Sequence, residues 1–223
     1  MSSENSNGWR TRPAYTVGQA SKLAGTSHAT IRRWLQGYSA PGHWMEPVFG
    51  EQRPIISFLG LAELVVVSAF RKKDIRLDRI RRAHQYAKEF FQTDFPFAFH
   101  DFKTDGASVL FEYQQREPGQ KLTILADKDG QVVLLAPVLE TVEQFDFEAE
   151  LVARWFPGGR DIPIVVDPRM GAGLPTVVDR GVRVEIIHKR WKAGQSIAFI
   201  ASDFQLKPNT VEKILQHAEK YAA

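Results

Sequence analysis

The segment from Tyr15 to Leu35, YTVGQASKLAGTSHATIRRWL, contains the clearest structural signals in the N-terminal part of the chain. Thr16 can cap a helix while the side chain of Gln19 reaches back to the Thr16 backbone, and small or apolar residues follow at helical spacing. Gly25 then supplies a residue that readily adopts a positive φ. This order of residues predicts a short helix that ends in a tight turn.

A second helix is expected directly after that turn, because Ser27 is a favourable cap residue. Its apolar residues fall on one side, where they can pack against small residues of the first helix. The apolar residues are Ile31, Trp34 and Leu35, and the small residues are Ala20 and Ser21. Two helices joined in this way form a helix-turn-helix.

The polar side of the second helix carries groups suited to nucleic acid. Hydroxyl, imidazole and guanidinium groups form hydrogen bonds with base edges and phosphates. A plain helical hairpin with a solvated polar side is the alternative. The residues that we expect to contact DNA are Ser27, His28, Thr30, Arg32 and Arg33.

Residues 36–55 are rich in Gly, Pro and aromatic residues, which is typical of a short β-ribbon or wing. Tyr38 and Arg53 would flank this wing and contact DNA. Apolar residues at helical spacing then predict two further helices, Phe58–Phe70 and Leu77–Phe91.

Basic residues are dense between and along these two further helices. The run includes Arg71 and Lys72, which we expect to meet the DNA backbone. An ordinary solvated helix surface is the alternative.

Residues 13–91 as a whole resemble the winged helix-turn-helix of MerR-type regulators. In that family the second helix enters the major groove and the wing touches the flanking backbone, so the resemblance implies these roles for the polar residues above and for Arg53. A MerR regulator continues into a long dimerising helix and an effector domain often built on cysteines. This chain has no cysteine, and its sequence shows no such long helix.

Composition limits the classes of protein to consider. The absence of cysteine excludes disulfides and thiolate chemistry and favours a cytoplasmic location. The polar residues 1–12 predict a flexible tail without a secretory signal. The longest apolar run, Leu59–Phe70, contains Glu63 and is far shorter than the roughly 20 residues of a membrane span.

Charge is distributed unevenly along the 223 residues. Residues 1–91 carry 14 basic and 7 acidic side chains, residues 92–165 carry 6 and 13, and residues 166–223 carry 9 and 6. Basic ends suit contact with phosphate or with an acidic partner, although ordinary solvated surfaces show similar counts.

The acidic middle has the alternating pattern of short strands. We expect strands over Ser108–Tyr113, Leu122–Leu125 and Val132–Leu135, with the last two joined as a hairpin through the turn sequence DKDG. Asp127 and Asp129 are assigned to that turn rather than to a metal site, because a calcium loop would need a suitably spaced Glu.

The carboxylates of the middle segment could include an acid–base pair. They show no pairing with a Lys or His motif, and the chain has no phosphate-binding loop, nucleophile turn or zinc-binding helix. A non-enzymatic protein with no cofactor or metal is therefore expected. The carboxylates are Asp94, Asp101, Asp105, Glu112, Glu140, Glu143, Asp146, Glu148 and Glu150.

The C-terminal residues predict a second helix-turn-helix. A helix from Val184 to Trp191 is followed by Gly194, Ser196 can cap the next helix, and Pro208 suits the first position of the last one. A three-helix module for dimerisation or protein contact is the alternative. The outward residues that we expect to contact DNA are Lys207, Asn209, Thr210 and Lys213.

The C-terminal segment is similar to the family known as domain of unknown function 433, found in antitoxins. The residues that carry this resemblance are Gly173, Pro175, Arg180 to Val184, Ala193 to Ser196 and Ile200 to Leu206. Together with the MerR-like head, it resembles the larger VapB-type antitoxins. The resemblance implies operator DNA and a PIN-class ribonuclease toxin as partners, with the complex repressing its own operon.

The sequence therefore predicts an α+β fold without a membrane partner, and the resemblance implies an antitoxin that forms a homodimer. The expected divisions are a tail over 1–12, a winged helix-turn-helix domain over 13–92, a small strand-rich middle over 93–165 and a three-helix domain over 166–223. The alternative function is a stand-alone MerR-like regulator that senses a small ligand through its middle domain.

Overall fold

A computed structural model of the chain describes residues 8–35, 55–125 and 132–221. The contacts divide the chain into two compact units, Met1–Val152 and Ala153–Ala223, called here unit 1 and unit 2. Helices and short two-stranded sheets are combined in an α+β fold, as expected. The structure differs from the expected domain division, because residues 93–152 share a compact unit with the helix-turn-helix.

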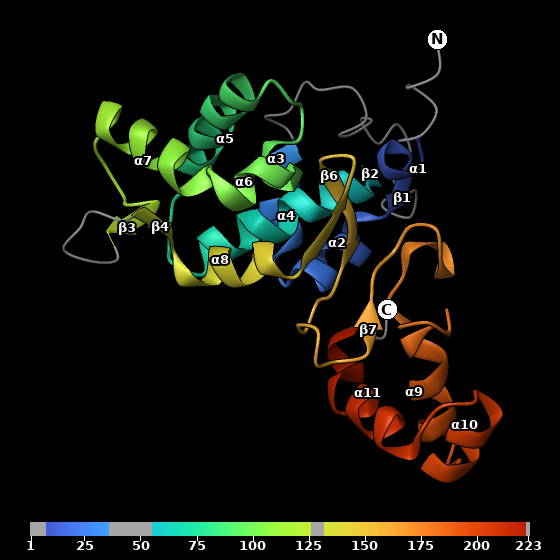
Figure 1. The fold of residues 1–223 in the computed structure, drawn as a ribbon. Coiled ribbons are helices and arrows are strands. Elements are labelled where there is room, and N and C mark those ends of the chain that lie inside the picture. The colour runs from blue at the N-terminus through green and yellow to red at the C-terminus, as the bar shows by residue number, and fades with distance from the viewer. Residues whose placement is uncertain (1–7, 36–54, 126–131, 222–223) are drawn as a thin grey trace. The chain divides into compact units, whose positions relative to one another are not determined.

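Unit 1 is mainly helical (Figure 1). β1 pairs with β2, β3 with β4 and β5 with β6, and the end of β6 enters unit 2. The elements are α1 (Gly8–Thr11), β1 (Pro13–Tyr15), α2 (Val17–Ala24), α3 (His28–Leu35), β2 (Ile56–Ser57), α4 (Phe58–Arg71), α5 (Leu77–Phe91), the 3-10 helix η1 (Pro96–Ala98), α6 (His100–Thr104), α7 (Gly106–Arg116), β3 (Thr123–Leu125), β4 (Val132–Leu134), α8 (Ala136–Glu143), β5 (Phe145–Glu148) and β6 (Leu151–Trp155).

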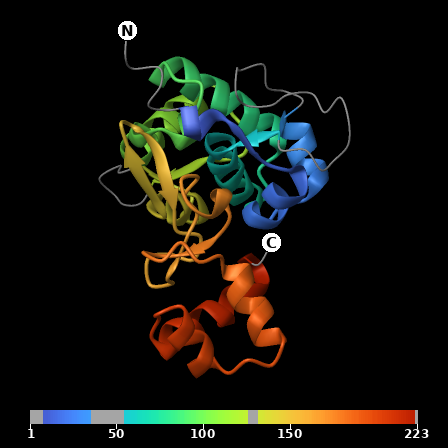
Figure 2. The same cartoon turned by 90° about the vertical axis from the view of Figure 1, so that its right-hand side faces the viewer.

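Helix α4 runs through the middle of unit 1 (Figures 1 and 2). It begins where the Ser57 hydroxyl accepts a hydrogen bond from the Gly60 N–H at 3.0 Å, and every residue from Phe58 to Phe70 is buried. Helices α1, α2, α5 and α8 and the turn η1 pack around it. Because each buried large apolar side chain contributes about 1.5–3 kcal/mol to the stability of the fold, α4 is the main source of stability in unit 1. The predicted helices Phe58–Phe70 and Leu77–Phe91 are confirmed.

The predicted strand over Ser108–Tyr113 is wrong, because these residues belong to helix α7. Val109, Leu110 and Tyr113 are buried on one side of α7, which is helical spacing. A six-residue apolar run does not distinguish a strand from a buried helix, and packing against α5 decides for the helix. Helices α6 and α8 also lie in the segment that was predicted to be rich in strands.

Two hairpins lie in the later part of unit 1. The predicted pairing of β3 with β4 is confirmed, with Thr123 opposite Leu134, and the DKDG turn lies outside the described residues. The hairpin of β5 and β6 was not predicted. Its turn consists of Ala149 and Glu150, which have φ values of +46° and +67° without being glycine.

Replacing Ala149 by asparagine is expected to raise the free energy of unfolding by up to about 1 kcal/mol, because asparagine tolerates positive φ better than alanine. Urea denaturation measures the change. The control is Ala149→Val, which should be less stable than wild type because a β-branched residue is strained at positive φ. A valine variant as stable as the asparagine variant would contradict the turn conformation.

The predicted flexible tail over residues 1–12 is wrong for its described part. Residues 8–11 form α1, and Arg10 is 2% exposed. The Arg10 guanidinium lies 3.7 Å from the Glu148 carboxylate of β5 and stacks 4.5 Å from the Trp9 ring. The tail prediction failed because α1 is ordered by contacts with residues distant in the sequence.

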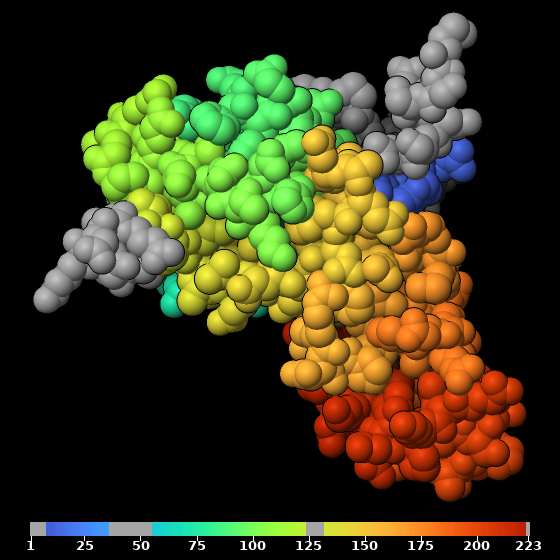
Figure 3. Space-filling model, viewed as in Figure 1, coloured from blue at the N-terminus to red at the C-terminus, as the bar shows by residue number. Residues whose placement is uncertain are grey.

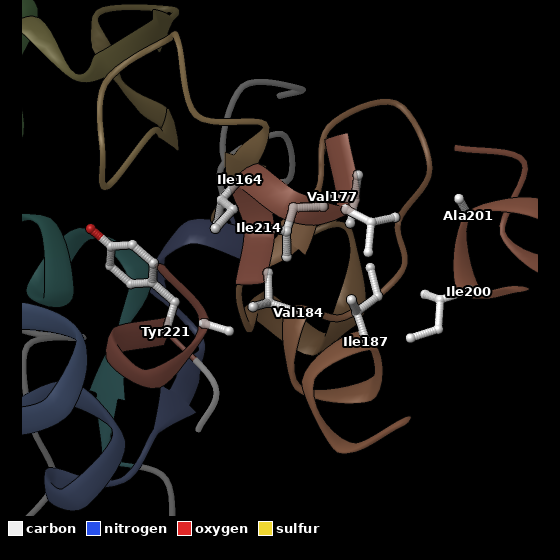
Figure 4. Close-up of a cluster of buried hydrophobic side chains, with 10 residues drawn as sticks. Ile164, Val177, Val184, Ile187, Ile200, Ala201, Ile214 and Tyr221 are labelled. Carbon is white, nitrogen blue, oxygen red and sulfur yellow. The ribbon is translucent and has the colours of Figure 1, made fainter. Parts of the chain in front are cut away.

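Unit 2 is a three-helix module preceded by a small sheet. Figure 4 shows its buried core, in which Val184 and Ile187 of α9 and Ile200 of α10 meet Ile214 of α11. The Tyr221 hydroxyl donates a hydrogen bond to the Pro157 carbonyl, which ties the last helix to the start of the unit. The elements are β7 (Ile164–Val165), η2 (Gly171–Gly173), β8 (Thr176–Val177), α9 (Val184–Lys192), α10 (Ile197–Asp203) and α11 (Pro208–Tyr221), with β7 antiparallel to β8.

Candidate nucleic-acid interface

The first helix-turn-helix forms as the sequence predicts. The Thr16 hydroxyl accepts a hydrogen bond from the Gln19 N–H at 3.1 Å, and the Gln19 side chain accepts one from the Thr16 N–H at 3.0 Å. Gly25 ends α2 with a φ of +62°, and the Ser21 hydroxyl donates to the Thr26 carbonyl across the turn. These contacts set the direction in which α3 leaves the turn.

Helix α3 begins after Ser27, whose hydroxyl accepts a hydrogen bond from the Thr30 N–H at 3.1 Å. The predicted inner side is confirmed, because Ile31, Trp34 and Leu35 are all buried. Of the residues that we predicted to contact DNA, Ser27, His28, Arg32 and Arg33 are exposed and Thr30 is half-buried. The structure thus brings these five polar residues together on one helix.

Two exposed features of this region were missed by sequence reasoning. Ala29 lies exposed between His28 and Thr30, where a methyl group could contact a thymine methyl. A side chain added at Gly18 would lie 4.0 Å from the His28 ring, so the start of α2 lies close to the start of α3.

Arg81 of α5 supports the other end of α3. Its guanidinium donates a hydrogen bond to the Arg33 carbonyl, one of the last carbonyls of the helix. A cation at a helix C-terminus also interacts favourably with the helix dipole. The sequence predicted that the basic residues of α5 contact DNA phosphate. The structure shows instead that Arg81 binds the end of α3 and holds this helix in position.

Much of the predicted basic run is engaged within unit 1. Arg76 pairs with Asp78 at 3.1 Å, Arg82 lies 3.6 Å from Glu117, and Arg79 is buried beneath the Tyr113 ring. The Arg71 guanidinium donates to the Ile75 carbonyl at 2.7 Å in the turn after α4, and the adjacent Lys72 is exposed. Tyr38 and Arg53, predicted to flank a wing, lie outside the described residues.

The second helix-turn-helix also has the predicted helices. Ser196 caps α10 by accepting a hydrogen bond from the Phe199 N–H at 3.2 Å, and α11 begins at Pro208. The predicted contact residues lie at the start of α11, where Thr210 is half-buried and the others are exposed: Lys207, Asn209 and Lys213.

Charge distinguishes the two helix-turn-helix units. Residues 17–35, which form α2, the turn and α3, contain three basic residues and no carboxylate. Residues 197–221 contain three lysines and three carboxylates, and one of those carboxylates, Asp203, pairs with Arg190. Because phosphate contacts dominate affinity for DNA, the helix-turn-helix of α2 and α3 is better suited to bind DNA than that of α10 and α11.

A buried polar pair lies directly behind α3. The imidazole Nε2 of His84 lies 2.9 Å from the carboxylate of Glu63, which also accepts the Phe97 N–H at 3.2 Å. The His84 ring stands edge-on to the rings of Trp34, at 5.4 Å, and Phe97, at 4.8 Å. Burial lowers the pKa of His84 well below its ordinary value, so the ring is neutral at pH 7 and donates its Nε2–H to Glu63.

The comparisons with known families agree with this geometry. Residues 13–84 match the family described as "Putative DNA-binding HTH domain", and residues 164–218 match the family described as "Protein of unknown function (DUF433)". The chain therefore contains a helix-turn-helix domain of the DNA-binding class and a DUF433 domain, as the sequence suggested. No helix among the described residues is long and apolar enough to cross a membrane.

Relatives match nearly the whole chain. It is 27% identical to the Mycobacterium tuberculosis protein named "Putative antitoxin VapB45", over 91% of this chain and 92% of the relative. It is 23% identical to the uncharacterized protein Rv2308 of the same organism, over 94% and 92%. The crystal structure of Rv2018 from M. tuberculosis is similar with a TM-score of 0.80 and 26% identity, over 92% of this chain and 97% of that one. The match to a DNA-binding helix-turn-helix family agrees with the expected non-enzymatic class.

Proposed function

We propose that this protein is the DNA-binding antitoxin of a type II toxin–antitoxin pair and represses its own operon in the cytoplasm. The observation that carries the proposal is the exposed side of α3, which holds Arg32 and Arg33 in a segment without any carboxylate. The match of residues 13–84 to a DNA-binding family supports the same reading.

Helix α3 acts as the recognition helix in this proposal. Ser27, His28 and Thr30 stand at its start, the end that contacts base edges in a helix-turn-helix, and the two arginines follow one turn later. Arginine binds guanine through two hydrogen bonds or pairs with phosphate as a charge. The polar residues at the start of α11 contribute less to DNA binding, because the carboxylates near them weaken the attraction of α11 for DNA phosphate.

A dimer is the expected binding form, since helix-turn-helix dimers bind two half-sites one helical turn apart. The partner is a toxin of the PIN ribonuclease class encoded beside this protein. The support for the toxin partner is the likeness, over 91% of the chain, to a relative named as an antitoxin.

The test is to co-express the protein with the product of the adjacent gene and to measure binding of the purified complex to the DNA upstream of the pair. Co-purification is expected, together with loss of ribonuclease activity in the complex. With four phosphate contacts in a dimer, DNA affinity should fall about 100-fold between 50 and 200 mM salt. DNA binding that depends on a small ligand, without a protein partner, would overturn the antitoxin function and favour a stand-alone regulator.

A further inference from the structure

Five aromatic side chains lie on unit 1 where α5 ends, α6 begins and β5 passes, in two groups of contacting rings. The ring centres of Phe90 and Phe91 are 5.3 Å apart, and Phe91 lies 5.9 Å from Phe99. His100 follows Phe99 in the chain, and its ring stands edge-on to Phe147 at 5.3 Å. We call these five residues the aromatic face: Phe90, Phe91, Phe99, His100 and Phe147.

The aromatic face is open to solvent. Phe90 is 54% exposed and His100 is exposed, while Phe91, Phe99 and Phe147 are half-buried. Several other large rings of unit 1, including Phe58, Phe70 and Phe97, are almost completely buried, whereas Phe90 is the most exposed of its described phenylalanines. Exposed aromatic side chains grouped on one part of a surface are typical of an interaction site.

Backbone contacts hold the aromatic face together. The His100 N–H donates a hydrogen bond to the Glu150 carbonyl at 2.6 Å, and Phe99 forms an isolated bridge with Leu151. Figure 3 shows the β5–β6 hairpin and the neighbouring α6 on the same side of unit 1. The surface is therefore preorganised by the fold, which reduces the entropy lost when a partner binds.

The segments that carry the aromatic face are strongly acidic. Residues 88–105 and 145–151 contain seven carboxylates and two lysines. Lys88 pairs with Asp94 at 2.7 Å, and His100 lies 3.2 Å from Asp101. The net charge of −5 repels DNA phosphate and attracts a cationic partner.

We propose that the aromatic face and its carboxylates bind the cationic, RNA-binding surface of the partner toxin. This inference rests on the proposed function. A ribonuclease must attract a polyanion, so its substrate surface carries Arg and Lys side chains, and such surfaces also accommodate stacked bases. Carboxylates take the place of phosphates, and aromatic rings take the place of bases and stack with guanidinium groups. The antitoxin thus excludes RNA by occupying its binding surface.

The test compares two matched double variants of the full chain with the co-expressed product of the adjacent gene. Phe90→Ala with Glu150→Lys alters the aromatic face. Phe199→Ala with Glu140→Lys makes the same changes at exposed residues elsewhere, since Phe199 is 55% exposed on α10 and Glu140 is exposed on α8. Thermal melting and binding to the upstream DNA verify that both variants are folded.

The aromatic-face variant is expected to bind the toxin about 100-fold more weakly, because it loses a cation–π contact and reverses an interfacial charge. The control should stay within about threefold of wild type. A 12-nucleotide oligouridine should compete with the wild-type antitoxin for the toxin.

Three results would overturn the inference. The aromatic-face variant could bind the toxin as wild type does, the control could lose as much affinity, or the variant could change only self-association in sedimentation. If wild type binds no adjacent-gene product, the proposed function fails and the inference fails with it. Toxin binding that survives in the aromatic-face variant rejects this inference alone.

Discussion

Replacing Arg32 and Arg33 together by alanine is expected to weaken binding to the upstream DNA by about 100-fold. Both arginines are exposed on α3, and residues 8–35 contain no carboxylate. Each specific arginine contact with a base contributes about 1–3 kcal/mol to discrimination, so the loss of two is large. Fluorescence anisotropy with labelled upstream DNA measures the change.

The matched control replaces Lys207 and Lys213 of α11, which are also exposed. This control should change DNA affinity less than about threefold if α2–α3 is the main reader. The salt dependence separates the roles of the arginines, because each lost phosphate contact reduces the slope of log K against log salt by about 0.9, whereas a lost base contact leaves it unchanged. A larger loss in the Lys207 and Lys213 variant would assign DNA binding to unit 2 instead.

Replacing His84 by alanine is expected to lower the free energy of unfolding of unit 1 by about 3–5 kcal/mol. The substitution leaves a cavity between the rings of Trp34 and Phe97 and removes a hydrogen bond to the fully buried Glu63 carboxylate. The Phe97 N–H still donates to Glu63, but a buried carboxylate that loses one of its hydrogen-bond donors is costly because less of its charge is then stabilised. Urea denaturation measures the change.

The control for this prediction is His100→Ala, because His100 is exposed. This variant should lose less than about 0.5 kcal/mol in free energy of unfolding. His84→Gln keeps a side-chain N–H donor and should lose less stability than His84→Ala. A loss below about 1 kcal/mol for His84→Ala would show that the Glu63 carboxylate finds another donor. Because His84 packs against Trp34 of α3, the alanine variant should also bind DNA more weakly.

The pH dependence of stability gives a second measurement on the same residue. Burial lowers the pKa of His84 well below its ordinary value of 6.5, so below pH 6.5 the unfolded chain takes up a proton that the folded chain does not. The contribution of the neutral His84 ring to the free energy of unfolding is therefore complete above pH 6.5. It declines as the pH falls, by up to about 1.4 kcal/mol per pH unit. His84→Gln should lack this decline, whereas His100→Gln should retain it.

The helices with strong local signals were predicted correctly. The capping residues Thr16 and Ser27 and the positive φ of Gly25 act over a few residues, so their effect is visible in the sequence. The C-terminal helices were also found, because Ser196, Pro208 and a regular apolar spacing mark them. Both helix-turn-helix units follow from such local rules.

The middle of the chain was predicted less well for a physical reason. Residues 108–113 have few local signals, and the buried contacts of Val109, Leu110 and Tyr113 with other helices select α7 over a strand. The β5–β6 hairpin was missed because its turn, Ala149 and Glu150, lacks the glycine or asparagine that favours positive φ. Long-range packing overrides local preference at both places.

The two helix-turn-helix units and the polar residues that each presents can be predicted from the sequence, because caps, turns and helical spacing are local properties. Which charged side chains are paired within the protein depends on its tertiary contacts. These contacts placed Arg81 at the end of α3, paired Arg76 and Arg82 with carboxylates, and joined distant segments in the aromatic face. Ion pairing and exposure depend on which residues meet in space, and contacts between segments far apart in the chain settle both.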